Sequence, residues 1–280
     1  MTQLWWSPAI EPFIAVIGNP RFHVEGSTCF TGVGCAELAA RSLENEVEAP
    51  CITFLSALEV NTRAREAFAL HSPTVACSGD ILQWLPLSTR GTIQRMRSFS
   101  ELRDLIFRAK LDLTGGRLGG PSFAFGQLHL AGPPCVDFSG MGRRRGKEGP
   151  TAIVLLTWAA GVRMEKPGIV VFENVVRFPL DLLVTLFGDL YHISPAVLDP
   201  VWWGWPGHRR RRYCILTLRG VVNLIRPLCD MNSLWHGSFT PAGRSCDRIA
   251  AGGSRVSGAS NKAPLAPGYR QNLIDHQRMF

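Results

Sequence analysis

One cysteine stands where an enzyme would place a nucleophile. Cys135 lies in the segment G-P-P-C-V-D-F-S-G-M-G at residues 132–142, directly after the apolar run 128–131. A strand that ends in Gly-Pro-Pro brings the thiol to the carboxyl edge of a sheet, where α/β enzymes build their sites. The prolines stiffen the approach, and Gly140 and Gly142 allow the following loop to move. The alternative is a small buried hydrophobic residue, which is what most cysteines inside cells are.

Two other segments place charged side chains beside predicted strands. Glu173 belongs to F-E-N-V at residues 172–175, and the basic run H-R-R-R occupies residues 208–211. A carboxyl group at a strand end can act as a general acid when burial raises its pKa. The alternatives are a carboxylate that only ends a strand and a basic run that is only solvated or binds phosphate.

Short apolar runs alternate with helix-like stretches between about residues 24 and 218. This alternation is typical of an α/β domain built on a mostly parallel sheet. We expect strands at residues 27–30, 51–58, 74–77, 127–131, 168–172 and 212–218, and helices at residues 35–43, 61–70, 99–110 and 151–163. Asn61 can cap its helix, and Ser98 forms a capping-box pattern with Glu101. Residues 115–120, with four glycines, predict a flexible loop.

Length and charge narrow the class of protein. A chain of 280 residues, 46% of them hydrophobic, can bury a core and suggests one large domain or one domain with an appendage. Its 30 Lys and Arg against 22 Asp and Glu give a net charge of +8. This balance favours a polyanionic partner such as nucleic acid, although a basic solvated surface has the same composition.

The cysteine and apolar patterns exclude several other classes. The eight cysteines form no C-x-x-C pair and no zinc spacing, so we expect neither a disulfide framework nor a metal site. The first twenty residues lack a signal-peptide pattern, and the longest apolar run, residues 152–162, is too short to span a bilayer. We expect an intracellular protein, nuclear in a eukaryote, with no membrane partner. The sequence indicates no oligomeric state.

Several motifs together resemble the cytosine-5 DNA methyltransferase family. The segment around Cys135 is similar to the family signature G-P-P-C-x-x-F-S-x-x-G, and F-T-G-V-G at residues 30–34 resembles F-x-G-x-G. E-N-V and G-H-R-R-R follow in the family's order, within residues 28–218. The resemblance implies a Rossmann-like, S-adenosylmethionine-dependent methyltransferase core at residues 24–219, with a C-terminal part that is truncated or irregular.

The resemblance also implies a cofactor site. The loop with Phe30, Gly32 and Gly34 would hold the methionine part of S-adenosylmethionine, where glycines permit close backbone approach and an aromatic face can meet the sulfonium. Glu59 would bond the ribose hydroxyls, and Asp80 the adenine amino group. Pro134 belongs to the same cofactor site. The alternatives are a Glu59 that caps a helix or is solvated, and an Asp80 that forms a turn.

The same resemblance assigns the catalytic groups. Cys135 would attack carbon 6 of a cytosine flipped out of its strand, while Glu173 serves ring nitrogen 3 as an acid. Arg211 would bond oxygen 2 of the base, and Arg209 would help to position the nucleophile loop and a phosphate. The family has glutamine where this chain has Gly207, so one supporting contact is missing.

A basic loop follows the predicted nucleophile, and the family has a mobile substrate-covering loop at this position. Its cations suit the phosphates of nucleic acid, although solvation alone would also explain them. The predicted contacts are Arg143, Arg144, Arg145 and Lys147.

The end of the chain lacks two features of the family. Residues 220–280, rich in Gly, Ser and Pro, contain neither a recognisable target-reading region nor a G-N-x-V-P motif, and residues 1–23 form an extension without a motif. We therefore expect a fragment, a truncated product or a diverged member. DNA is the expected partner, and its target sequence is not readable. The alternatives are a transfer-RNA methyltransferase, an impaired nucleic-acid-binding module, and a methyltransferase of the same architecture with another substrate.

Overall fold

A computed structural model describes the part of the chain that carries all of these motifs. The described residues are 23–96, 98–115, 121–140, 142, 144–203 and 207–223. They belong to one unit, Met1–Ala242, and the second unit, Gly243–Phe280, lies outside them. The predicted extension and tail therefore fall outside the description, apart from residue 23 and residues 220–223. Among the described residues, no helix is long and apolar enough to cross a membrane.

A seven-stranded sheet organises the described residues. Its order is β3-β2-β1-β4-β5-β7-β6, with β1 to β5 parallel and β7 antiparallel to both of its neighbours. The strands are β1 (Val24–Cys29), β2 (Ile52–Leu58), β3 (Ala76–Ser78), β4 (Leu128–Ala131), β5 (Ile169–Val175), β6 (Tyr191–Leu198) and β7 (Arg211–Leu218). The predicted Rossmann-like α/β class with a mostly parallel sheet is confirmed.

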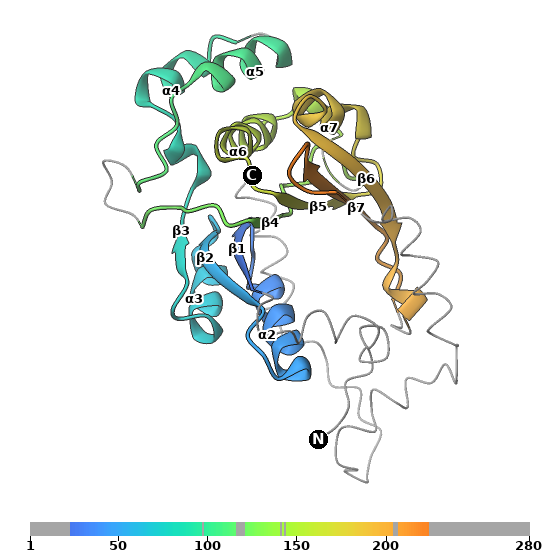
Figure 1. The fold of residues 1–280 in the computed structure, drawn as a ribbon. Helices are drawn as coiled ribbons and strands as arrows, with labels where there is room; N and C mark the ends of the chain where they lie inside the picture. The colour runs from blue at the N-terminus through green and yellow to red at the C-terminus, as the bar shows by residue number, and fades with distance from the viewer. Residues whose placement is uncertain are drawn as a thin grey trace, which may run out of the picture. The chain divides into compact units, whose positions relative to one another are not determined.

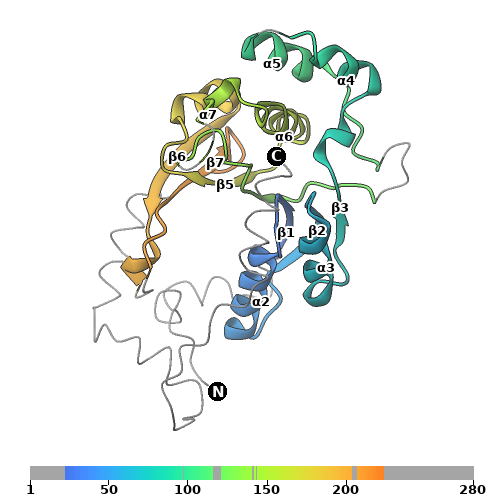
Figure 2. The same ribbon diagram turned by 180° about the vertical axis from the view of Figure 1, so that it is seen from behind.

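Helices cover both faces of this sheet. Two helices lie on one face, α2 (Cys35–Val47) and α3 (Thr62–His71). The opposite face carries α4 (Leu87–Ile93), α5 (Phe99–Arg108), α6 (Ala152–Glu165) and α7 (Leu180–Phe187), as Figures 1 and 2 show from two sides. Three short 3-10 turns complete the description: η1 (Ile81–Trp84), η3 (Gly146–Glu148) and η4 (Pro200–Trp203).

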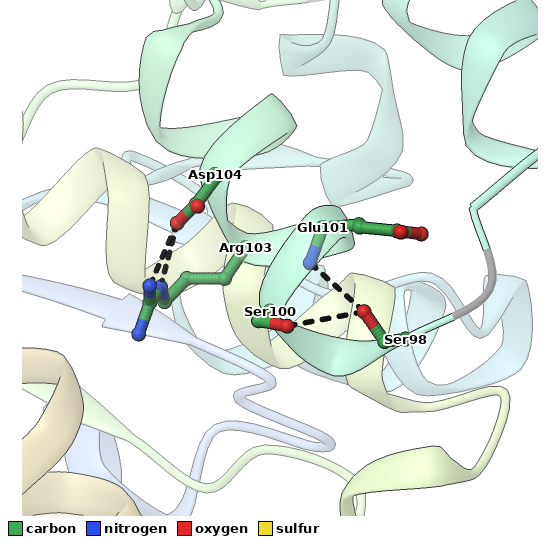
Figure 3. Close-up of polar contacts among 5 residues, drawn as sticks. All are labelled: Ser98, Ser100, Glu101, Arg103 and Asp104. Carbon is green, nitrogen blue, oxygen red and sulfur yellow. Dashed lines mark hydrogen bonds and ion pairs between the residues drawn. The ribbon is translucent and has the colours of Figure 1, made fainter.

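Two predicted helix caps are present. The Asn61 side chain accepts a hydrogen bond from the backbone N–H of Ala64 at 3.1 Å, where α3 begins. Ser98 Oγ accepts one from the backbone N–H of Glu101 at 3.2 Å, where α5 begins (Figure 3). Each cap satisfies a donor that the first turn of a helix leaves free, so sequence alone located these two starts.

The element prediction was wrong at four places. It contained no β6, α4 or α7, and it ended α2 four residues before Val47. β6 is an edge strand with Ser194 and Pro195 in its middle, and such a strand lacks the apolar signal of a central one. Helix α7 has the sequence L-D-L-L-V-T-L-F, and a short apolar run of this kind is equally typical of a buried strand.

A buried polar contact joins β1 to β4. Trp158 donates its indole N–H to His129 Nε2 at 3.0 Å, so the ring hydrogen is on Nδ1, which donates to Ser27 Oγ at 2.8 Å. All three side chains are fully buried. Burial lowers the pKa of His129 to about 3, and the ring is therefore neutral at physiological pH. The neutral His129 ring therefore connects β4 to Ser27 of β1 and to Trp158 of α6.

Candidate active site

The Cys135 loop begins at the carboxyl end of β4 and is held from β5. Asn174, which is buried, donates its side-chain amide to the carbonyl of Pro133 at 3.0 Å. The backbone N–H groups of Phe138 and Ser139 donate to the carbonyl of Cys135 at 2.9 and 2.8 Å, which folds the chain into a turn there. The Cys135 side chain is partly exposed. Cys135 is therefore not sealed inside the core.

Glu173 lies against the start of this loop. The parallel register pairs Ala131 of β4 with Phe172 of β5, so the next residues, Gly132 and Glu173, are neighbours. A Cβ built on Gly132 would lie 3.2 Å from Glu173 Oε2. A residue larger than glycine would therefore press on the carboxyl group. The absence of a side chain at position 132 lets the acid approach the backbone that carries Cys135.

Arg211 contacts Glu173 across two antiparallel strands. Glu173 pairs with Tyr213, and Arg211 lies two residues earlier on the same face of β7. Its Nε lies 2.9 Å from Glu173 Oε1. Burial raises the pKa of the Glu173 carboxyl, while the charges of Arg211 and Arg209 act in the opposite direction. The carboxyl group is thus more easily protonated than an ordinary glutamate.

The segment before β7 is anchored by an acid that sequence analysis missed. Asp199, buried after β6, accepts hydrogen bonds from His208 Nδ1 at 2.9 Å and from the backbone N–H of Arg209 at 3.2 Å. The hydrogen bond from His208 lowers the pKa of the Asp199 carboxyl. Arg209 itself is exposed. No sequence signal identified Asp199, because its partners lie about ten residues away across a turn.

The structure brings three of the four predicted catalytic residues to one edge of the sheet. Glu173 and Arg211 are in contact, and both lie beside the loop that carries Cys135. The thiol makes no hydrogen bond to either of these two side chains. Arg209 contributes only its charge to the Glu173 carboxyl.

The predicted cofactor residues lie at the ends of β1, β2 and β3. The loop after β1 has an unusual backbone, because Phe30, Gly32 and Gly34 all have positive φ values of 62°, 59° and 86°. Glu59 holds it from β2: Oε2 accepts from the backbone N–H of Gly32 at 2.9 Å, and Oε1 from that of Asn61 at 2.8 Å.

Asp80 makes a local bond as well. Its Oδ1 accepts from the backbone N–H of Leu82 at 2.9 Å and caps η1. The backbone N–H of Glu59 donates to the carbonyl of Ser78 at 3.0 Å, so the two acids follow adjacent strand ends. The local bond of Asp80 is that of the alternative, a turn-forming residue, whereas Glu59 bonds the loop of residues 30–34. A carboxylate oxygen can accept more than one hydrogen bond, and these contacts leave further acceptor capacity on both groups.

A buried glutamate behind this loop was also missed by sequence analysis. Glu37, in the first turn of α2, accepts from Thr28 Oγ1 at 2.5 Å and from Thr31 Oγ1 at 3.0 Å. The side chain is only 4% exposed. A glutamate three residues after Gly34, with threonines before and within the loop of residues 30–34, was the available signal. Glu37 fixes the loop to the helix that follows it.

Two of the predicted nucleic-acid contacts line a cavity of about 840 Å³ between α5, the loop after Cys135 and α7. Arg144 is folded back on the loop, since its Nε and Nη2 donate to the carbonyl of Gly140 at 2.9 and 2.5 Å. Lys147 lies 6.0 Å from the centre of the Phe99 ring. The charged lining residues are Arg103, Asp137, Arg144, Lys147, Glu148, Arg177 and Asp181.

The cations of this cavity are not all neutralised. In the described part of the chain, no acidic oxygen lies within 4.0 Å of Arg144, Lys147 or Arg177. Arg103 is paired with Asp104 at 2.7 Å (Figure 3). Arg145 does not line the cavity, and Arg143 lies outside the described residues. Arg177, two residues after E-N-V, was not predicted, although its position beside that motif was a usable signal.

The described residues contain neither a metal-binding cluster nor a disulfide bond. No group of three or more His, Cys, Asp or Glu side chains there is placed to hold a metal ion. The six described cysteines, Cys29, Cys35, Cys51, Cys77, Cys135 and Cys214, all carry free thiols.

One segment of the chain is similar to a known protein family. Residues 127–233 match the family model C-5 cytosine-specific DNA methylase. No curated protein matches the chain. Similar solved structures include the S. pombe Dnmt2 methyltransferase (16% identity, TM-score 0.46, covering 72% of this chain and 53% of that one). Another is a putative DNA modification methyltransferase encoded within an E. coli prophage (15%, 0.46, 74% and 53%).

The similarity to these structures is weak. The Entamoeba histolytica methyltransferase EhMeth has 16% identity and a TM-score of 0.45, covering 73% of this chain and 56% of its own. Likeness of this strength says nothing about the substrate. The chain spans about half the length of the structures that it matches. The segment that matches the C-5 cytosine-specific DNA methylase model, residues 127–233, holds Cys135, Glu173 and Arg211.

Proposed function

We propose that this chain transfers a methyl group from S-adenosylmethionine to carbon 5 of cytosine in DNA, through a covalent adduct with Cys135. The observation that carries the proposal is the position of Glu173. This carboxyl group has a raised pKa, contacts Arg211 at 2.9 Å and lies against the glycine that begins the Cys135 loop. A thiol, an acid and a guanidinium at one strand edge supply what addition to a pyrimidine requires.

The chain's own residues account for the addition step. The Cys135 thiolate forms a bond to carbon 6, and the electron pair displaced from the ring double bond moves toward ring nitrogen 3 and carbon 5. Glu173 gives a proton to nitrogen 3, and its raised pKa favours the protonated form that this needs. Arg211, held by Glu173, can bond oxygen 2, where negative charge develops.

The remaining steps restore the base. When bound, S-adenosylmethionine supplies the methyl group that carbon 5 receives. Loss of the proton from carbon 5 then expels the Cys135 thiolate and re-forms the ring double bond. Glu173 returns to its starting state as nitrogen 3 loses its proton. The target base must leave its strand, because these protein groups cannot reach its faces and edges while it is stacked and paired in a duplex.

The loop after β1 suits the cofactor. A Cβ built on Gly32 would meet no atom within 4 Å, so open space lies beside this backbone. Phe30 begins the same loop, and Glu59 and Asp80 follow the two adjacent strands. Pro134 lies next to Cys135 on the neighbouring strand end. The loop of residues 30–34 would hold the methionine part of the cofactor. Glu59 would hold the ribose, and Asp80 would hold the adenine.

The partner is proposed from charge. The chain carries a net charge of +8, and Arg144, Lys147 and Arg177 have no acidic partner within 4.0 Å among the described residues. Such cations bind phosphates with an affinity that falls steeply as salt rises. We include Arg145 and Arg143, which belong to the same basic run, in the proposed nucleic-acid contact.

Covalent trapping tests the proposed reaction. A DNA duplex that contains 5-fluorocytosine, incubated with the protein and S-adenosylmethionine, should give an adduct stable in denaturant, because fluorine at carbon 5 cannot leave as a proton. Cys135→Ala should give none, while Cys35→Ala, a control at an exposed cysteine outside the site, should react like the wild type. Absence of the wild-type adduct, or an adduct with Cys135→Ala, contradicts the mechanism.

A further inference from the structure

The loop that follows β1 is held by a residue that no motif includes. His71, the last residue of α3, has its Nε2 2.5 Å from the carbonyl oxygen of Val33. A carbonyl oxygen only accepts, so Nε2 carries the hydrogen and donates it to the loop. Nδ1 lies 2.9 Å from Ser72 Oγ, which fixes the plane of the ring. His71 therefore bonds the middle of the Gly32 to Gly34 turn from outside that turn.

The ring is also packed tightly against the loop. A Cβ built on Gly34 would lie 2.5 Å from His71 Cε1 and 2.7 Å from Phe68 Cδ2, so only glycine fits at this position. Phe68 is fully buried, and its ring meets that of His71 edge to face at 5.5 Å. The His71 ring is therefore held in place by packing against the buried Phe68 as well as by its hydrogen bonds.

His71 connects the loop to the helix that follows it as well. Arg41 of α2 donates its Nη2 to the carbonyl oxygen of His71. Helix α2 begins at Cys35, directly after the loop, so one residue contacts the loop through its ring and the next helix through its backbone. Glu59 holds Gly32, and His71 holds Val33.

The loop needs such support. Phe30 has a φ of 62°, a conformation that a residue with a Cβ adopts only at a cost. Without an external contact the segment has other conformations available, and any of them would move the backbone beside the open space at Gly32. A fixed loop lowers the entropy that a ligand must otherwise lose on binding.

We propose that His71 is a positioning residue for the cofactor: its hydrogen bond to Val33 keeps the loop of residues 30–34 in the shape that binds the methionine part of S-adenosylmethionine. The inference rests on the cofactor site of the proposed function. His71 does not take part in the chemical step. Its loss should weaken cofactor binding and leave turnover at saturating cofactor unchanged.

Titration calorimetry with S-adenosylhomocysteine tests the inference. His71→Leu keeps a side chain that can fill much of the same space but removes the donor, and we expect the dissociation constant to rise about three- to ten-fold, the range of one hydrogen bond. His71→Gln keeps an N–H at similar reach and should bind within about two-fold of the wild type. His192→Leu, at an exposed histidine on β6, is the control and should not change binding.

Kinetics and hydrogen exchange separate positioning from a purely structural effect. In His71→Leu the KM for S-adenosylmethionine should rise while kcat stays the same. In the protein without cofactor, the Gly34 amide, which donates to the carbonyl of Thr31 at 3.0 Å, should exchange faster than in the wild type. If His71→Leu does not fold, His71→Asn, whose shorter side chain cannot reach Val33, replaces it in both measurements.

The outcomes distinguish the two proposals. Wild-type affinity in the donor-less variant, or equal weakening in His71→Gln and His71→Leu, overturns the positioning assignment. If the wild type itself binds no S-adenosylhomocysteine, the proposed function fails. The hydrogen exchange of the Gly34 amide then still decides whether His71 fixes the loop: unchanged exchange in the variant overturns that step too.

Discussion

Two neighbouring regions at one edge of the sheet are held in different ways. The catalytic region, formed by Glu173, Arg211 and the Cys135 loop, depends on a charged pair at 2.9 Å and on a raised carboxyl pKa. The cofactor region, formed by residues 30–34 and their contacts, depends on the hydrogen bonds that its backbone gives to Glu59 and accepts from His71, and on close packing at Gly34.

This difference separates what substitutions should do. A change of charge in the catalytic region alters protonation and therefore the chemical step, with little loss of packing. A change of size in the cofactor region alters backbone shape and therefore binding and folding. His129 lies between the regions, because it joins β1 of one to β4 of the other.

Glu173→Gln should abolish most turnover. The amide is close in shape to the acid but cannot give a proton to ring nitrogen 3, and loss of a general acid typically costs about 10²- to 10⁴-fold in rate. The melting temperature should change little, because Arg211 is partly exposed and can be solvated. Single-turnover methyl transfer and differential scanning calorimetry on the same preparation measure both. Rates within ten-fold of the wild type would remove Glu173 from the mechanism.

The pH dependence of the same step has a definite sign. The protonated Glu173 carboxyl is the active form, so the contribution of this group is full below its pKa and falls as pH rises through it. Because burial raises that pKa above the ordinary range, this decline begins at a higher pH than for an exposed glutamate. Rate profiles of wild type and Glu173→Gln should therefore differ most at low pH.

Gly34→Ala should destabilise the fold much more than Gly32→Ala. Both residues have positive φ, which costs an alanine about 1 kcal/mol. At Gly34 the new methyl would also overlap the rings of His71 and Phe68, adding about 1–3 kcal/mol, whereas nothing lies within 4 Å at Gly32. Urea denaturation measures the difference. Equal losses in the two variants would mean that His71 and Phe68 do not confine the loop.

Acidification should weaken the connection between the two regions. His129 is neutral in the folded protein, with a pKa near 3, and titrates at about 6.5 when unfolded. Its contribution is full above pH 6.5 and is lost as pH falls toward the folded value. This loss amounts to about 2 kcal/mol between pH 7 and pH 5. His129→Gln, compared with the wild type at both pH values, should lack this part of the pH dependence; the same dependence in both would contradict it.

The smallest effect should come from the cavity cations. Lys147→Gln and Arg177→Gln should each reduce the slope of log affinity for DNA against log salt by about 1, the value for one released counterion. Arg108→Gln, at the exposed end of α5 and outside the cavity, is the matched control and should leave the slope unchanged. Filter binding at several salt concentrations measures it. A slope unaltered by Lys147→Gln and Arg177→Gln would place the phosphates elsewhere.

Sequence alone predicted the elements with strong local signals. The central strands have continuous apolar runs, and the capping residues Asn61 and Ser98 mark where their helices begin. Edge strand β6 and the short helix α7 were missed because their local patterns fit more than one structure. The motif residues Cys135, Glu173 and Arg211 were predicted from the resemblance of their segments to family motifs, and the structure places Glu173 on β5 and Arg211 at the start of β7.

Two of the supporting residues, Asp199 and His71, were beyond sequence analysis for a physical reason. Asp199 and His71 bond backbone groups, and a backbone N–H or carbonyl carries no residue identity that a sequence could display. Arg177 depends on a cavity formed by segments from three parts of the chain. Such contacts follow from the register of the sheet, which a single sequence does not specify.

Methyl transfer tests the central claim most directly. Radiolabelled S-adenosylmethionine, incubated with the protein and either DNA or transfer RNA, should label DNA, and digestion should locate the label in 5-methylcytosine. Cys135→Ala should transfer none. Label in transfer RNA alone would change the substrate but keep the chemistry, whereas no methylated cytosine from the wild type, or the same yield from Cys135→Ala, would contradict the account.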